Sequence, residues 1–161
     1  MAGPAAPAIR PAARADAEAI VAVHTAAIAR VCSPHYTARQ VRVWLSLRDA
    51  AGYHPDIDRG ELFVCEESGR LIGFGQARPG QVVAVFVHPD RAGRGVGARL
   101  LEHALVLARR GHEGPVTVIA TLNAVGFYER HGFRVVRRYA ETRRGVGLPV
   151  VEMSLAPPPR D

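Results

Sequence analysis

The sequence predicts an α/β (α+β) fold, with a mixed, mostly antiparallel sheet of six to seven strands flanked by four helices. Three apolar runs joined by short turns between residues 62 and 87 predict consecutive antiparallel strands. A long helical pattern then separates the third run from an apolar run at 116–120, which predicts one right-handed parallel crossover. Helical patterns also precede and follow these elements, so we expect helices on both faces of the sheet.

The N-terminal segment predicts a short strand and a first helix. Residues 9–12 form the strand, and Pro11 restricts it to an edge or an end of the sheet. Asp16 is suited to cap the helix, because its carboxylate can accept hydrogen bonds from N–H groups that lack partners in the first turn. The apolar stripe of this helix recurs at helical spacing and consists of Ile20, Val23, Ala27 and Val31.

A second helix is expected after a break at Ser33-Pro34. Thr37 is suited to cap it. Its apolar face carries Val41, Trp44 and Leu45. Residues 52–60, which begin and end with glycine, are expected to form a loop.

The central part of the chain carries the strongest patterns. The three consecutive strands are expected at 62–65, 71–77 and 82–87, and the last of these is apolar throughout, as in a strand covered on both faces. A long helix at 95–110 stops at Gly111. The remaining predicted elements are a strand at 116–120, a short helix at 123–131, and strands at 133–136 and 150–155.

Length and composition predict one domain at 9–155 between flexible tails at 1–8 and 156–161. Cys32 and Cys65 lack Cys-x-x-Cys spacing, so we expect neither a metal site nor a disulfide framework. The sequence shows no secretory signal and no apolar stretch long enough to span a membrane. The expected location is therefore the cytoplasm, with no membrane partner.

The net charge of +6 comes from 21 basic residues, all of them arginine. The absence of lysine excludes a Walker-type phosphate loop and a Schiff-base mechanism, since both need that amine. A basic chain also raises nucleic acid as a partner. No basic run exceeds two residues and no known nucleic-acid-binding motif is present, so we expect no nucleic-acid partner.

The sharpest local signal is a glycine-rich loop between the apolar strand ending at Val87 and the following helix. Free backbone N–H groups and the dipole at a helix N-terminus form a site for an anion such as a pyrophosphate. Arg94, with Arg91 or Arg99, can add charge-assisted hydrogen bonds. A Rossmann loop is disfavoured, because the spacing is G-x-G-x-G and the loop follows the fourth strand.

Two blocks of this sequence resemble the GCN5-related N-acetyltransferase (GNAT) superfamily. The first is Val85-Phe86-Val87-His88-Pro89 with the glycine loop at 91–97 behind it. The second, at 120–133, is similar to the family's Asn-Ala-x-x-Phe-Tyr-x-x-x-Gly-Phe segment. Their joint occurrence in the right order is more specific than either block alone. Position 92 is alanine, where the family often has glutamine or arginine, a tolerable change because backbone donors carry most of the phosphate binding.

The resemblance implies acetyl-CoA as co-substrate and assigns roles to its binding residues. The end of the fourth strand, at Val85, Phe86 and Val87, would pair with the pantetheine amides. The pyrophosphate would lie on Ala92, Gly93, Arg94, Gly95, Val96, Gly97 and Ala98. Asn123 would bond the pantetheine arm and Phe127 would pack against it. Tyr128 would protonate the departing thiolate, a reasonable role for a phenol with a pKa of about 10.

For the amine acceptor, the resemblance points to the first two helices and the region 139–149. The expected substrate contacts are therefore His35, Tyr36 and Trp44, although core packing is the simpler explanation for Trp44. The general base stays open, because the strand at 82–87 contains no carboxylate. The candidates outside that strand are His35, Tyr36, His54 and Glu66, and a water chain or an amine of lowered pKa needs no dedicated base.

The predicted function is transfer of an acetyl group from acetyl-CoA to an amine of a small molecule or peptide. The amine would attack directly within a ternary complex, without a covalent acyl-enzyme. The alternative is an inactive acyl-CoA-binding sensor or regulatory module, motivated by the missing carboxylate. The expected oligomeric state is a monomer or a homodimer.

Overall fold

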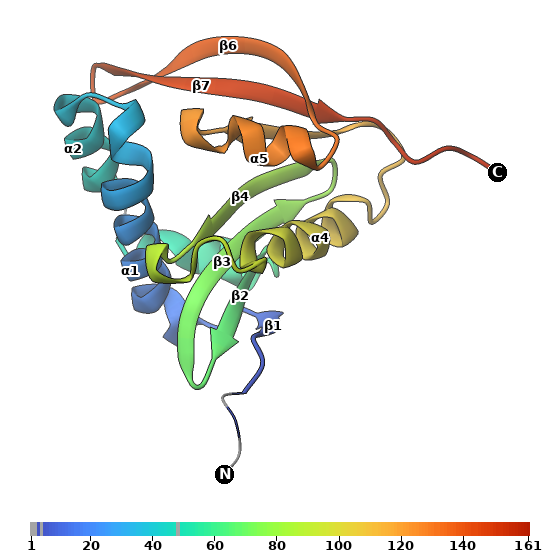
Figure 1. Ribbon diagram of the computed structural model, residues 1–161, viewed down its shortest axis with the longest axis horizontal. Coiled ribbons are helices and arrows are strands. Elements are labelled where there is room, and N and C mark those ends of the chain that lie inside the picture. The colour runs from blue at the N-terminus through green and yellow to red at the C-terminus, as the bar shows by residue number, and fades with distance from the viewer. Residues whose placement is uncertain (1–2, 4, 48) are drawn as a thin grey trace.

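The computed structural model describes residues 3, 5–47 and 49–161 (Figure 1). Of the tail predicted at 1–8, residues 1–2 and 4 lie outside the described residues. Residues 156–161 contain no helix or strand.

The described strands form one sheet in the order β1-β2-β3-β4-β5-β7-β6. Their bounds are β1 (Ala8–Pro11), β2 (Leu62–Glu67), β3 (Arg70–Arg78), β4 (Gln81–Val87), β5 (Val116–Ala120), β6 (Arg134–Arg143) and β7 (Val146–Leu155). β4 and β5 pair in parallel, and the other neighbouring strands pair antiparallel. The predicted mixed, mostly antiparallel sheet is confirmed.

The described α-helices are α1 (Ala17–Ala27), α2 (Ala38–Ser46), α3 (His54–Asp58), α4 (Val96–Ala108) and α5 (Val125–Arg130). The count of four helices was wrong by one, because α3 lies in the expected loop at 52–60. Proline is accepted in the first turn of a helix, where Pro55 lies, and Ile57 is buried. Tertiary burial of Ile57 thus stabilises a helix too short to show a periodic pattern.

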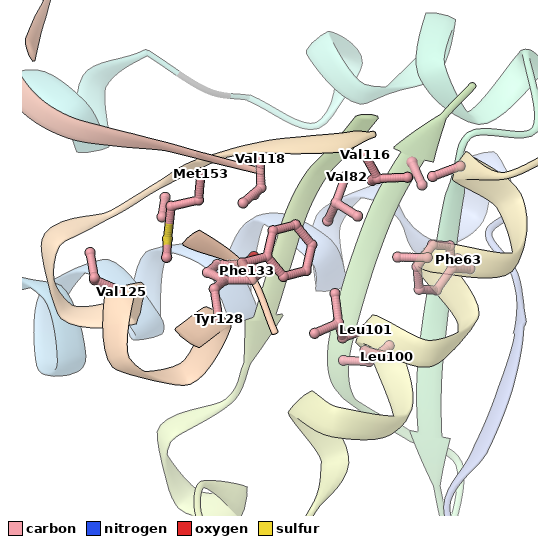
Figure 2. Close-up of a cluster of buried hydrophobic side chains, with 14 of the residues drawn as sticks. Phe63, Val82, Leu100, Leu101, Val116, Val118, Val125, Tyr128, Phe133 and Met153 are labelled. Carbon is pink, nitrogen blue, oxygen red and sulfur yellow. The ribbon is translucent and has the colours of Figure 1, made fainter. Parts of the chain in front are cut away.

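The sheet separates two apolar cores. On one face, Ile20 and Val23 of α1 pack with Ile57 of α3 and Phe74 of β3. On the other face, α4 and α5 cover β2 to β5 and β7, and Figure 2 shows side chains of this larger core around Phe133. Helices therefore lie on both faces of the sheet, as predicted.

α1 does not end as the apolar stripe predicts. It continues as a π-helical segment, Ile28–Cys32, and then as a 3-10 turn, Ser33–His35. Val31 was expected on the buried face, yet it is 38% exposed, whereas Cys32 is buried. A π turn contains more residues than an α turn, so it shifts the buried face by one position.

β6 and β7 extend further than predicted and include most of the region 139–149. Their pairing continues from Arg134↔Ser154 to Arg143↔Val146. The hairpin closes at Arg144 and Gly145, which both have positive φ, 48° and 75°, as in a type I′ turn. β6 lies at the edge of the sheet and is largely exposed, so its charged sequence gave no apolar alternation to recognise.

β4 and β5 pair over only a short distance. Their register contains two pairs, Gln81↔Thr117 and Val82↔Val118. β4 then continues to Val87 beside β3, while β5 continues to Ala120 beside β7. The two strands therefore diverge, and the edge of β4 beyond Val82 that faces β5 has no strand partner among the described residues.

Gly75 is required where the ring of Phe63 crosses β3. A Cβ atom at Gly75 would lie 2.4 Å from Cζ of Phe63 and 3.3 Å from the carbonyl oxygen of Ala84. We expect Gly75→Ala to lower the free energy of unfolding by about 1–3 kcal/mol through overpacking, measured by urea denaturation. Gly147→Ala is the matched control, because its Cβ would make an ordinary 3.5 Å contact with Ala140. Equal stability of the two variants would contradict this account of Gly75.

Candidate functional site

A cavity of about 270 Å³ opens where β4 and β5 diverge. Val85 and Phe86 of β4 line one wall, and Ile119 and Ala120 of β5 line another. α1, α2, α5 and the β6–β7 hairpin contribute further residues. The polar and charged lining residues are His24, Tyr36, Gln76, Gln81, Thr121, Tyr128, Glu141 and Arg143.

The glycine loop leads from β4 into α4. Gly93 and Gly95 have φ values of 75° and 81°, and Gly95 is the N-cap of α4. L residues rarely adopt this conformation, so the loop geometry itself requires glycine at both positions. Ala92 to Gly95 are exposed. Val96 is 4% exposed and packs in the core, so only its backbone can contact a ligand on the loop, and Ala98 is half-buried.

The arginines near the loop differ in their partners. Nε of Arg91 donates to Glu67 at 2.8 Å, and Nη1 of Arg99 donates to the carbonyl oxygen of Pro7 at 2.8 Å. Arg94 is exposed and forms no ion pair with any residue that the structure describes. Arg94 is therefore the predicted loop arginine best placed to meet an anion on the loop.

Three predicted binding residues from separate elements meet at Gly97. A Cβ atom there would lie 3.4 Å from Cε2 of Phe127 and 3.6 Å from Cγ2 of Val87. The start of α4, the end of β4 and α5 are therefore in contact. The ring of Phe127 is also 5.1 Å from that of Tyr128, which lines the cavity. The start of α4 below the glycine loop therefore lies next to the residues that line the cavity.

Asn123 carries an unsatisfied acceptor. It lies in a 3-10 turn, Leu122–Ala124, directly after β5. Its Oδ1 is buried and has no hydrogen-bond partner among the described residues. Burial of an unpaired amide oxygen is unfavourable unless a donor is supplied. The oxygen is therefore available to a ligand N–H group.

Tyr128 is held by rings on both sides. The ring centroids of Phe133 and Phe127 lie 5.3 and 5.1 Å from its own, and its side chain is 4% exposed. Figure 2 shows Tyr128 next to Phe133 at the margin of the large core. Burial raises the pKa of Tyr128 well above its ordinary value. The phenol consequently keeps its proton at neutral pH and can act as a donor.

Of the three predicted acceptor contacts, Tyr36 and Trp44 line the cavity. His35 does not, because it is exposed on the 3-10 turn before Tyr36. His54 and Glu66, considered as bases, also lie outside the lining, and Glu66 accepts from Nε of Arg10 at 2.9 Å. The structure therefore brings together two of these five side chains.

Tyr36 ties the cavity walls together. Its hydroxyl donates to the carbonyl oxygen of Pro149 at 2.8 Å and accepts from the N–H of Leu122 at 3.0 Å. Burial raises the pKa of Tyr36, so the hydroxyl stays protonated at neutral pH. The π-helical segment and 3-10 turn place Tyr36 inward, whereas a regular continuation of α1 would change its direction.

Sequence reasoning missed His24, Gln76, Gln81, Glu141 and Arg143. His24 follows Ile20 by four positions and lies on the buried face of α1 in the structure, but a histidine at such a position does not by itself indicate a site. Gln76 lies within β3, and Gln81 is the first residue of β4. Glu141 and Arg143 lie in the region 139–149, which was assigned to the acceptor pocket without naming residues.

Comparison with known proteins agrees with this geometry. Residues 32–157 match the family model of the acetyltransferase (GNAT) domain. The chain belongs to the GNAT family. A GCN5-related N-acetyltransferase of Rhodopseudomonas palustris has the same fold, with a TM-score of 0.88, 27% identity, and coverage of 97% of this chain and 99% of that one. Together with the shared fold, the match confirms the predicted family and the assignment as an acetyltransferase.

Two further GNAT proteins are similar. An uncharacterized N-acetyltransferase of Escherichia coli, YafP, is 26% identical over 130 residues, 81% of this chain and 83% of its own. YncA of Salmonella typhimurium, a putative acetyltransferase whose structure contains acetyl-CoA, shares the fold with a TM-score of 0.67 and 23% identity, covering 98% of this chain and 97% of its own. The family match and the acetyl-CoA in that relative support the prediction of acetyl-CoA as co-substrate.

The described residues contain no group of three or more histidine, cysteine, aspartate or glutamate side chains arranged to hold a metal ion. None of the described helices is both long enough and apolar enough to cross a membrane.

The Tyr36 hydroxyl acts as a donor to Pro149 and as an acceptor from Leu122, and its removal tests both hydrogen bonds. We expect Tyr36→Phe to lower the free energy of unfolding by about 1–3 kcal/mol, because the N–H of Leu122 and the carbonyl of Pro149 lose their shared partner. Urea denaturation measures the change. Tyr139→Phe is the control, since among the described residues the hydroxyl of Tyr139 bonds Glu141 alone, at a long 3.4 Å. If both variants lose the same stability, the Tyr36 hydroxyl does not link the walls as described.

Proposed function

We propose that this GNAT protein transfers the acetyl group of acetyl-CoA to an amine of a small molecule or peptide. The observation that carries the proposal is the divergence of β4 and β5, because it leaves an unpaired strand edge beside a cavity that Tyr128 lines. The protein works in the cytoplasm as a monomer or homodimer, with residues 9–155 as its single domain and without nucleic acid or membrane as partners.

The site residues divide the binding of acetyl-CoA among them. The backbone from Ala92 to Ala98 holds the pyrophosphate at the N-terminus of α4. The free edge of β4 at Val85–Val87 pairs with the pantetheine amides, as an added strand does. Oδ1 of Asn123 accepts a hydrogen bond from the same arm, which satisfies its buried oxygen. Phe127 packs against the arm between the loop and the cavity.

Tyr128 serves as the general acid. Its buried phenol keeps its proton and faces the cavity, so it can protonate the thiolate that leaves as the amide forms. Proton transfer from a positioned side chain contributes about 10²–10⁴-fold to a rate. Tyr36 and Trp44, on the opposite wall, contact the acceptor.

The amine attacks the thioester directly. A covalent acyl-enzyme needs a reactive thiolate, and burial opposes that at both cysteines. Burial raises the pKa of Cys32 to about 11 and raises that of Cys65 as well. Both side chains are buried and neither lines the cavity. A ternary complex is therefore the mechanism these residues support.

A CoA-binding sensor is the second candidate, because β4 carries only apolar side chains from Val82 to Val87. The polar groups of α1, α2 and β6 in the same cavity favour turnover instead. Calorimetry with acetyl-CoA and thiol detection across an amine panel separate the two functions. Binding without release of CoA from any amine would favour the sensor.

Tyr128→Phe tests the general acid. The substitution keeps the ring between Phe127 and Phe133 and removes only the hydroxyl. We expect kcat to fall by about 100-fold with little change in KM, since the proton is needed only as the thiolate leaves. Steady-state thiol release measures both constants. An unchanged kcat would assign the hydroxyl a packing role.

Gly95→Ala tests the pyrophosphate loop, with Gly60→Ala as a matched control. Both glycines have positive φ, 81° and 74°, and open space around a Cβ atom. Each variant should lose about 1 kcal/mol of stability from backbone strain. Only Gly95→Ala should also weaken the binding of acetyl-CoA in calorimetry, because only that strain shifts the loop N–H groups. Equal affinity of the two variants would place the pyrophosphate elsewhere.

A further inference from the structure

The geometry points to His24 as the residue that takes the proton from the acceptor amine, with Tyr53 as the residue that positions it. This inference rests on the proposed function and fills its one missing role. His24 comes from α1, on the face of the sheet opposite α4 and α5. The proton acceptor and the general acid Tyr128 therefore enter the cavity from different helices.

His24 lies against the strand that would hold the thioester. Its ring centroid is 4.3 Å from that of Phe86 in β4, and both side chains line the cavity. The side chain of His24 is 3% exposed. Phe86 lies on the part of this free edge, Val85–Val87, that we propose pairs with the pantetheine amides. An amine in the cavity thus meets the imidazole beside the place where the thioester carbonyl is expected.

Tyr53 fixes the orientation of the imidazole. Its hydroxyl lies 2.7 Å from Nδ1 of His24, and its side chain is 3% exposed. When Nδ1–H donates to this oxygen, the neutral ring carries its basic lone pair on Nε2. Partners of this kind select the tautomer of catalytic histidines. The rings of Trp44 and Phe74 also lie near the imidazole, with centroids 6.5 and 5.7 Å from its own.

Two other cavity residues that could accept a proton, Glu141 and Tyr36, are held by hydrogen bonds of their own. Glu141 accepts from Nη2 of Arg143 at 2.9 Å, which holds both charges in an ion pair. The hydroxyl of Tyr36 bonds Pro149 and Leu122. Of the elements packed on His24, the turn before α3 presents Tyr53, while α2, β3 and β4 present the aromatic rings of Trp44, Phe74 and Phe86. Imidazole is also the side chain that exchanges protons readily near neutral pH.

The proposed steps balance in protons and electrons. Nε2 of His24 takes a proton from the acceptor ammonium, and the freed electron pair on nitrogen attacks the thioester carbon. The C–N bond forms and the C–S bond breaks. Tyr128 gives its proton to the departing sulfur and regains one from the new amide nitrogen. His24 returns its proton to solvent, so one proton is released for each amide formed.

The tautomer can be measured without knowing the acceptor. Nitrogen-15 NMR of the labelled full-length protein distinguishes Nδ1–H from Nε2–H in a neutral imidazole. We expect Nδ1–H in the wild type and a population of Nε2–H in Tyr53→Phe, which removes only the hydroxyl. A wild-type ring that carries its proton on Nε2 while neutral would overturn the inference.

Kinetics test the role in turnover, with phenylethylamine, tryptamine, spermidine and a peptide with a free N-terminus as acceptors. At pH 7, His24→Gln should lower kcat/KM by about 100-fold, and the deficit should shrink as pH rises and the amine loses its own proton. Tyr53→Phe should cause a smaller loss with the same pH trend. His112→Gln, a histidine on the turn after α4, should change neither the rate nor its pH dependence.

The outcomes separate this inference from the proposed function. No thiol release by the wild type with any acceptor overturns the proposed function and the inference with it. If the wild type turns over and the folded His24→Gln variant has the same kcat/KM, only the role of His24 is overturned. Calorimetry should give equal affinity for acetyl-CoA in the wild type and His24→Gln, whereas a loss of that affinity equal to the loss in rate would make His24 a binding residue.

If His24→Gln fails to fold, the pH profile of Tyr53→Phe decides instead, and a profile like that of the wild type overturns the inference.

Discussion

The site depends on the short length of the pairing between β4 and β5. The parallel pairing of β4 and β5 stops after Val82 and Val118. Beyond these residues the two strands continue in the same direction without backbone pairing between them. Backbone groups on the free edge of β4 need partners, and a sheet supplies none there. The protein thereby presents a ready-made strand edge inside its own fold, where an extended ligand can complete the sheet.

The link between α1 and α2 connects the walls of this opening. The π-helical segment Ile28–Cys32 packs against the turn that follows β5, and Tyr36 bonds that turn and β7 with one hydroxyl. π-helical turns are unfavourable and occur frequently at functional sites. Here the π-helical segment ends at the buried Cys32, and the 3-10 turn after it leads to Tyr36, which joins two walls of the cavity.

The sequence predicted elements with strong local signals and missed those that tertiary contacts create. A few adjacent residues suffice to predict each of three features: the apolar run of β4, the loop at Gly93 and Gly95, and the Phe127-Tyr128 pair. α3 depends on the burial of Ile57, and the long β6–β7 hairpin depends on pairing at an exposed edge. His24 was missed for the same reason, because its proximity to Tyr53 and Phe86 joins three segments that are distant in the chain.

The position of β4 between the two cores explains how one strand serves both halves of the reaction. Val85 and Val87 pack with the core of α4 and α5, whereas Ala84 and Phe86 pack with that of α1 and α3. The glycine loop that we propose binds the pyrophosphate belongs to the first side with Tyr128, and His24 belongs to the second. Alternation along a strand sends successive side chains to opposite faces, so adjacent residues contact donor and acceptor machinery. A carboxylate on β4 is then unnecessary, because an imidazole reaches the same cavity from α1.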